Sequence, residues 1–303
     1  MGKSHSNHHF IPKFLLKEWT GTDRKLTYFY WRPDGILHDG RCGPGGVGAE
    51  EHLYSQRRES GELDPEIEVD VFSKIVDDPS APVHQQLLAG RLGELTDTEK
   101  KAWSNFLVAQ MIRVPSMVQY LLDKGRQLML RDIEGIEPPD EIKGQLGDLT
   151  LQQYLESDGS RLLDNASLRA LRLIIESGTL NSVFLDSMWA VRDVSKSNLD
   201  LVIGDRPLLQ EGRMNEQYLF MLPLSPAVAF IVTNESQVAQ NLSAETARNV
   251  VMTFNKEATQ VADTHVYATN GRQRPMIDRY LRKPVAPDDR HVVSGLREAL
   301  AAA

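Results

Sequence analysis

A dense group of apolar side chains lies within the first twenty residues, directly after two adjacent histidines. The histidines are His8 and His9, and Pro12 interrupts the apolar run. The large apolar side chains of this segment are Phe10, Ile11, Phe14, Leu15, Leu16 and Trp19. Burying each of them stabilises a fold by about 1.5–3 kcal/mol, so the segment needs a core that later parts of the chain must build. We therefore expect it to be anchored inside the protein and to hold both imidazole rings in fixed positions.

The composition is that of an ordinary globular protein. The chain has 303 residues, of which 41% are hydrophobic and 25% are charged, which suits one large domain or two small ones. Since no repeat and no clear linker interrupts it, the sequence predicts a single composite domain over residues 1–285 and a flexible tail over 286–303.

Three features of the sequence favour a cytoplasmic protein. No apolar run approaches the roughly 20 residues that span a bilayer, so we expect no membrane partner. The N-terminus lacks the pattern of a secretory signal. The single cysteine, Cys42, excludes an intramolecular disulfide. Export by a route that reads no N-terminal signal stays open.

The net charge of −8 argues against broad nucleic-acid binding by bulk electrostatics. Basic residues nevertheless gather near both ends of the chain. They are Lys3, Lys13, Lys17, Arg24 and Lys25 at the start, and Arg272, Arg274, Arg279, Arg282 and Lys283 near the end. If the ends meet in space, they form a basic surface, which leaves nucleic acid and protein open as partners.

The hydrophobic pattern predicts an α+β fold, with a helical central region packed on a mainly antiparallel sheet built from an N-terminal hairpin and C-terminal strands. The hairpin combines residues 25–31 and 36–38, with a turn at Pro33-Asp34-Gly35. Further strands are expected over residues 189–192, 199–203, 218–222, 228–233 and 265–268.

Helix boundaries are predicted by capping residues and prolines. Thr96 and Glu99 have the spacing of a capping box, and Pro115 is expected to break the helix that they begin. Ser243 is expected to cap a later helix over residues 244–257. Residues 134–149 are rich in Gly, Pro and acids and are predicted to be a surface loop, and 43–48 a mobile glycine-rich loop.

Several polar residues lie where a functional site could form. Asp64 and Pro65 predict a helix start, and Glu68 then shares one face with Phe72 and Ile75. Gln110 and Arg113 precede the helix break, where Arg113 suits a buried ion pair or the binding of an anion. Asp205 directly follows a strand that looks buried, so it is either a functional acid or a turn residue.

The expected catalytic residues are His8, His9, Glu68 and Asp205, and Gln110 and Arg113 are the expected anion-binding pair. Imidazole and carboxylate groups are ligands for divalent metals and can move protons near neutral pH. His8, His9 and Glu68 therefore form a candidate metal-ligand set. The cofactor stays open, with a divalent metal as one option.

The block His8-His9-Phe10-Ile11-Pro12 and the apolar run after it resemble a microbial family known only as a domain of unknown function, which carries an N-terminal His-His-x-x-Pro signature. The chain is also similar to that family around Glu68, at Gln110 and Arg113, and at the turn Asp205-Arg206-Pro207. There, Ile203 and Gly204 replace the two hydroxyl residues of the family pattern. The resemblance spans most of residues 7–268 and implies no established reaction.

Two main hypotheses for the function follow, and whether the protein is an enzyme stays open. The first is an uncharacterised intracellular bacterial protein that acts as a binding or sensor module of a conflict or stress system, with structural histidines. The alternative is a metal-dependent phosphodiesterase or nuclease that uses the His8-His9 pair. A third hypothesis is a metal-independent transferase or glycosidase-like enzyme, with Glu68 as base or nucleophile and Arg113 as phosphate clamp. Convergence of the candidate side chains in one pocket would favour an enzyme.

Overall fold

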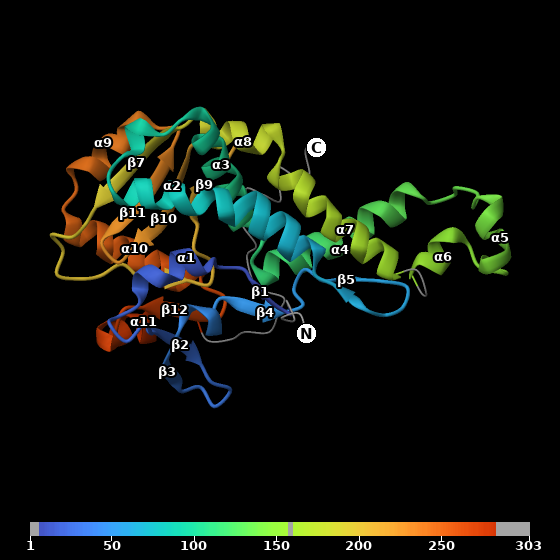
Figure 1. The fold of residues 1–303 in the computed structure, drawn as a ribbon, viewed down its shortest axis with the longest axis horizontal. Coiled ribbons are helices and arrows are strands. Elements are labelled where there is room, and N and C mark those ends of the chain that lie inside the picture. Colours follow the sequence, from blue (N-terminus) through green and yellow to red (C-terminus); the bar gives the residue numbers. More distant parts are fainter. Residues whose placement is uncertain (1–5, 157–159, 283–303) are drawn as a thin grey trace.

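The computed structural model describes residues 6–156 and 160–282. It shows a compact body from which a helical arm projects to one side (Figure 1). The body contains two four-stranded antiparallel sheets, whose orders are β7-β11-β10-β9 and β3-β2-β12-β8. The predicted α+β class is therefore confirmed, but the single expected sheet is divided into two.

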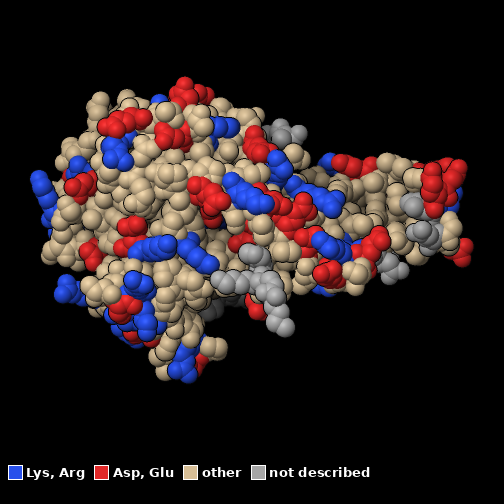
Figure 2. Space-filling view, in the orientation of Figure 1, with Lys and Arg blue, Asp and Glu red and all other residues tan. Residues whose placement is uncertain are grey.

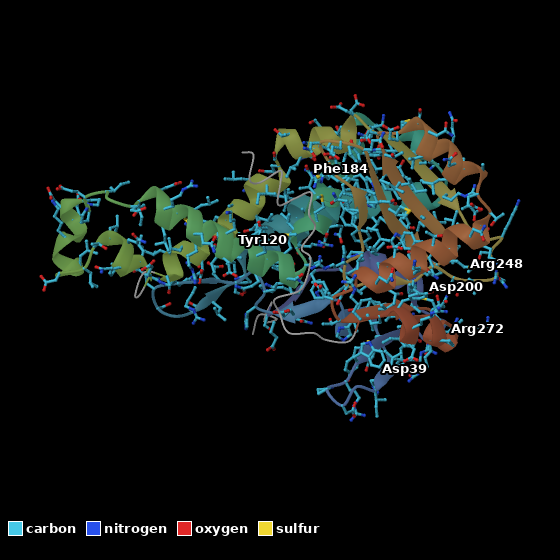
Figure 3. The ribbon with its side chains drawn as sticks, turned by 180° about the vertical axis from the view of Figure 1, so that it is seen from behind. Asp39, Tyr120, Phe184, Asp200, Arg248 and Arg272 are labelled. Atoms are coloured by element: carbon cyan, nitrogen blue, oxygen red, sulfur yellow. The ribbon has the colours of Figure 1, made fainter. Side chains whose placement is uncertain are left out.

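The first sheet is formed by the C-terminal half of the chain. Its strands are β7 (Met188–Asp193), β11 (Val228–Thr233), β10 (Tyr218–Ser225) and β9 (Leu209–Gly212). Side chains of β10 and β11, such as Phe220 and Phe230, pack into the main hydrophobic core together with Trp103. Phe184 joins them from helix α8 (Gly178–Leu185), at the top of the body (Figure 3).

The second sheet joins the two ends of the chain. Its strands are β3 (Leu37–Cys42), β2 (Leu26–Trp31), β12 (His265–Ala268) and β8 (Ile203–Gly204). The predicted hairpin and the predicted strand over 265–268 are thus confirmed. The expected strand over 199–203 is mostly wrong, because its backbone bonds to loops and side chains. Leu201 N donates to the Pro226 carbonyl, and Val202 N donates to the Asn255 side chain.

The predicted capping box and helix break are both present. Thr96 and Glu99 exchange side-chain and backbone hydrogen bonds at the start of α3 (Asp97–Ile112). Pro115 begins α4 (Pro115–Asp132), since a proline fits the first turn of a helix but not its interior. Helix α7 (Ser160–Ile175) packs against α4 to form the arm, and α5 (Asp140–Leu146) and α6 (Leu151–Glu156) lie at its far end (Figure 1).

Three predicted boundaries are wrong. The expected loop over 134–149 contains α5, whose first turn carries Asp140 and Glu141, acids that favour a helix N-terminus. Ser243 lies inside α9 (Ser236–Ala244), and the cap of α10 (Ala247–Val261) is Thr246. The helix expected to begin at Asp64 and Pro65 begins slightly later. Asp64 lies in a short strand, β6 (Leu63–Asp64), which pairs with β5 (Gln56–Arg57), and its Oδ1 accepts a hydrogen bond from the Glu66 amide at 3.1 Å just before the helix.

The N-terminal segment is anchored as predicted. After β1 (Asn7–His9) come α1 (Lys13–Leu16) and a 3-10 turn (Lys17–Trp19). Ile11, Leu15, Leu16 and Trp19 are all completely buried. The Trp19 indole also donates a hydrogen bond to the Leu201 carbonyl, 2.8 Å away, which ties the start of the chain to its C-terminal half.

The two ends of the chain meet in the lower part of the body. Asp39 of the hairpin forms an ion pair with Arg274, the first residue of α11 (Arg274–Tyr280). Figure 3 shows Asp39 and Arg272 in this lower part of the body. Arg41 likewise pairs with Asp23. On the face drawn in Figure 2, blue side chains over this region lie beside red ones. Lys3 and Lys283 lie outside the described residues.

The single domain over residues 1–285 stays a prediction, and the expected tail over 286–303 lies outside the described residues. Within the described ranges, no helix combines the length and apolar character needed to cross a bilayer.

We predict that Thr96→Ala lowers the free energy of unfolding by about 1 kcal/mol, because the first turn of α3 loses its cap. Urea unfolding monitored by circular dichroism measures the change. Thr98→Ala is the matched control, since Thr98 lies on the same exposed turn. An equal effect of both variants would show that the cap does not stabilise the helix.

Candidate functional site

His8 lies on β1, which pairs with β4 (Ala49–Glu51), and its side chain is buried. The side chain binds the backbone of the segment that follows β4. Its Nδ1 accepts a hydrogen bond from the Tyr54 amide, 2.9 Å away, and its ring stacks on the Tyr54 ring at 5.5 Å. Nδ1 must therefore be unprotonated, and the neutral ring carries its proton on Nε2. These contacts give His8 a structural role, because one of its two nitrogens is already used inside the protein.

His9 and Glu68 are neighbours with opposite shifts of pKa. The His9 amide donates to Glu68 Oε1 at 3.2 Å. Within the described part of the chain, His9 Nε2 and Glu68 Oε2 are buried without a hydrogen-bond partner. Burial, with help from Lys13 and Arg113, lowers the pKa of His9 to about 4. Burial also raises the pKa of Glu68 to about 7. Near neutral pH the His9 imidazole is therefore uncharged. The pKa of Glu68 is close to that pH, so its carboxyl group gains or loses a proton at a small free-energy cost.

Arg113 lies completely buried behind this pair. Its Nη1 donates to Asp77 Oδ1 at 2.9 Å. The Gln110 amide, oriented with its oxygen toward the guanidinium, accepts from Arg113 Nε at 2.8 Å. The guanidinium carbon lies 5.9 Å from the ring centre of Phe72 and 5.7 Å from that of Phe106. Gln110 and Arg113 thus form an internal ion-pair cluster. The expected anion-binding role has no exposed face, because the guanidinium is enclosed by protein.

A π-helix over Ile67–Asp77, which continues into α2 (Asp78–Leu88), makes this cluster possible. Asp77 lies nine positions after Glu68 in the sequence. At about 3.6 residues per turn, an α-helix would place them on opposite faces. A π-helix has about 4.4 residues per turn, so nine residues complete about two turns and both carboxylates face Arg113. The α-helical spacing used for the sequence prediction was therefore wrong for this segment.

The candidate metal-ligand set is not arranged around one point. Among the described residues, no group of three or more His, Cys, Asp or Glu side chains could hold a metal ion. His8 directs Nδ1 at the Tyr54 amide, and Glu68 binds the His9 backbone. His8, His9, Glu68, Gln110 and Arg113 thus converge on one region of the core, but as a buried polar cluster instead of a metal centre.

Asp205 lies apart from this cluster and is 4% exposed. Its two carboxylate oxygens accept backbone hydrogen bonds of 2.7–2.8 Å from Asp263, Thr264 and His265, and one more from the Thr264 hydroxyl. Burial and the nearby Asp263 raise the pKa of Asp205, whereas these donors favour its charged form. The carboxylate therefore fixes the turn before β12. This is a different turn from the local one before Arg206-Pro207 that the sequence suggested as the alternative role of Asp205.

Asp205 also lines a pocket of about 390 Å³. Five stretches of the chain, which lie far apart in the sequence, form its wall. The lining residues are Phe10, residues 46–50, Pro115, Ser116, Asp205, residues 263–265 and Tyr267. A pocket of this size falls within the range of about 300–1,000 Å³ that is typical of small-molecule sites.

Polar side chains fix one side of the pocket. Ser116 donates to Asp263 Oδ2 at 2.6 Å, and Arg206 donates to the Ser116 hydroxyl at 2.7 Å. Arg206 Nε also lies 3.0 Å from Asp263 Oδ2. Sequence reasoning missed Glu50, Ser116, Asp263 and His265 as site residues. No regular spacing in the sequence relates these four residues. The local signal is the polar run Asp263-Thr264-His265 at the start of a strand.

The glycine-rich loop forms the opposite wall. Gly48 has a φ of +63°, and its carbonyl accepts hydrogen bonds from the amides of Phe10 and Ile11 at 2.9 and 3.1 Å. A side chain at this position would also press on Leu16 and Ile11 at 3.0–3.1 Å. The predicted mobile loop is therefore fixed at its C-terminal end, where it meets the anchored N-terminal segment.

We predict that Glu68→Gln changes how stability depends on pH. The pKa of Glu68 rises on folding, so this group destabilises the fold as the pH rises from about 4.5 to 7. The pKa of His9 falls on folding, so that group has the opposite effect between about pH 4 and 6.5. Removing the Glu68 carboxyl should leave the His9 effect unopposed.

Urea unfolding at pH 5, 6 and 7 tests this prediction. The free energy of unfolding of the variant, minus that of the wild type, should rise by roughly 0.5–1.4 kcal/mol per pH unit. Glu66→Gln, at an exposed neighbouring position, should leave the difference flat. A flat difference for Glu68→Gln as well would mean that the Glu68 carboxyl is not desolvated.

We further predict that Asp205→Asn lowers the free energy of unfolding by about 2–4 kcal/mol, since an amide nitrogen would then face backbone N–H donors. Urea unfolding at pH 7 measures the loss. Asp200→Asn, which changes an exposed side chain (Figure 3), should stay within about 0.5 kcal/mol of the wild type. Equal stability of the two variants would contradict a structural role for Asp205.

Comparison with known proteins identifies the family. A family model described as "Protein of unknown function (DUF4238)" matches residues 7–272, so the chain belongs to this family. The resemblance to a domain-of-unknown-function family is thereby confirmed. The searches of curated proteins and of solved structures gave no match. The matched range contains both the buried polar cluster and all residues that line the pocket.

Proposed function

We propose that this member of the family is a binding module that holds a small ligand in the pocket between the glycine-rich loop, the start of α4 and the turn before β12. The observation that carries the proposal is the pocket itself, about 390 Å³ in volume and lined by both apolar and polar groups. Phe10, Pro115 and Tyr267 supply apolar surface. Glu50, Asp263 and His265 supply groups that can orient a ligand.

One of these polar groups is not used inside the protein. The Glu50 side chain is exposed at the pocket and has no hydrogen-bond or ion-pair partner within the described residues. Asp205, in contrast, uses both oxygens to hold the turn at 263–265. The site therefore combines a rigid wall with a carboxylate that is available to a ligand, as a binding site needs.

A ligand in the pocket would contact segments that are distant in sequence, among them the loop at 46–50 and the turn at 263–265. A ligand that binds only the folded state stabilises that state by mass action. A bound ligand would therefore strengthen the association between the N-terminal anchor and the C-terminal turn. This is a way in which a sensor can respond to a ligand. We extend the proposal to a sensor module of a conflict or stress response, the setting expected from the sequence.

The alternative of a metal-dependent phosphodiesterase or nuclease receives less support. Such an enzyme needs metal ligands and a cation that faces the phosphate. His8 Nδ1 is occupied by the Tyr54 amide, and the Arg113 guanidinium is enclosed by Asp77, Gln110 and two phenylalanine rings. The residues expected to carry that chemistry are thus engaged with one another.

We predict that a chemically diverse panel contains ligands of this pocket. The panel comprises tryptamine, putrescine, indole-3-acetate, glucose and adenosine 5′-monophosphate. At least one should bind with a Kd below about 1 mM in calorimetric titrations. Ala49→Trp should weaken that binding at least tenfold, because the indole ring would fill the pocket.

Glu51→Trp is the matched control, since it places the same side chain on the same strand at a residue that does not line the pocket. Circular dichroism confirms that both variants are folded. The proposal fails if no member of the panel binds, or if binding survives Ala49→Trp.

A further inference from the structure

The charge of the pocket limits what it can bind. Its lining contains three carboxylates, those of Glu50, Asp205 and Asp263. Among the described residues, no Lys or Arg side chain lines it. The nearby Arg206 is already paired with Asp263. The lining therefore carries more negative than positive charge. This excess attracts a positively charged ligand and repels a phosphate or carboxylate, so we expect the pocket to bind a cation.

An aromatic strip leads out of this pocket along the second sheet. We define it as Tyr28 and Tyr30 of β2, His38 of β3, and His265 and Tyr267 of β12. The register of the sheet sets them side by side, with Tyr30 between His38 and His265, and Tyr28 opposite Tyr267. Tyr267 is buried and lines the pocket, whereas the other four side chains are partly exposed.

The rings of the strip are close enough to act as one surface. Tyr30 and His265 stack with their centres 5.2 Å apart, and His265 stacks on Tyr267 at 6.2 Å. His38 meets the Tyr30 ring edge-on at 5.2 Å. Because His265 and Tyr267 belong to both the strip and the pocket lining, a ligand in the pocket would have aromatic faces beside it.

A glycine keeps part of the strip flat. Gly40 lies opposite Tyr28 in the β2–β3 pair, and the Tyr28 ring extends across it. A β-carbon at position 40 would overlap the Tyr28 hydroxyl and ring. The absence of a side chain there lets Tyr28 lie against the sheet. The faces of tyrosine rings attract cations as well as flat ring systems.

Resting on the proposed function, we infer that the ligand is an organic cation with a flat ring. Its ammonium or guanidinium group is held by Glu50, whose carboxylate has no partner among the described residues, and its ring packs against His265 and Tyr30. A nucleotide would place a phosphate among the carboxylates without a cation to pair with, so it is the disfavoured ring-bearing ligand.

Calorimetric titration tests the inference with probes that separate ring from charge. Tryptamine carries both a ring and an ammonium group, indole-3-acetate has the same ring with a carboxylate, and putrescine is a cation without a ring. Tryptamine should bind at least tenfold more tightly than either. Adenosine 5′-monophosphate should bind more weakly than tryptamine.

Substitutions at Glu50 and Tyr30 test the ammonium contact and the ring contact separately. Glu50→Gln should weaken tryptamine binding at least tenfold, while the matched control Glu51→Gln should leave it unchanged. Tyr30→Leu should weaken tryptamine binding at least threefold, Tyr30→Phe should retain it, and neither should alter the weak binding of putrescine. Thermal unfolding confirms that each variant is folded.

The outcomes separate the inference from the proposed function. If indole-3-acetate, glucose or the nucleotide binds best and Ala49→Trp removes that binding, the pocket is a ligand site but the cation assignment is wrong. Binding of tryptamine that is indifferent to Glu50→Gln would overturn the assignment equally. If no probe binds, the proposed function fails together with the inference.

Discussion

The pairing of β1 with β4 connects all parts of the candidate site. The Gly48 carbonyl accepts hydrogen bonds from the amides of Phe10 and Ile11, and the side chains that follow are completely buried in the main core. This short ribbon therefore cannot move without exposing a large apolar surface. His8 and His9 on β1 belong to the polar cluster, and residues 46–50, which include the start of β4 and the loop before it, line the pocket.

The polar cluster behind the ribbon shows how a buried charge is accommodated. Arg113 is completely enclosed and would be costly to bury alone. Asp77 supplies the opposite charge, Gln110 an acceptor, and two phenylalanine rings flank the guanidinium. Glu68 adds a second carboxylate that this single cation does not fully compensate. Burial raises the pKa of Glu68, and the negative charge of Asp77 adds to this, whereas the hydrogen bond from the His9 amide and the charge of Arg113 oppose it. The π-helix is the backbone geometry that brings both acids to the same side.

The sequence identified many of the residues that matter but misjudged their roles. His8, His9, Glu68, Gln110 and Arg113 do converge, since polar residues set among large apolar neighbours are buried with them and need one another as partners. Asp205 was singled out correctly as a residue at a strand end, yet it lies in a different place and holds a turn. The pocket was missed because Glu50, Ser116, Asp263 and His265 come from three separate segments, and no local pattern relates them.

The sequence by itself determined the class of fold, the anchored N-terminus, the hairpin, the capping box at Thr96 and the helix break at Pro115. All of these depend on residues within a few positions of one another, or on total apolar content. Only the tertiary structure decided that the strands divide into two sheets, that residues 67–77 form a π-helix, and that the turn at 263–265 meets the loop at 46–50. Each of these depends on contacts between segments that are far apart in the chain, where packing and burial outweigh local preference.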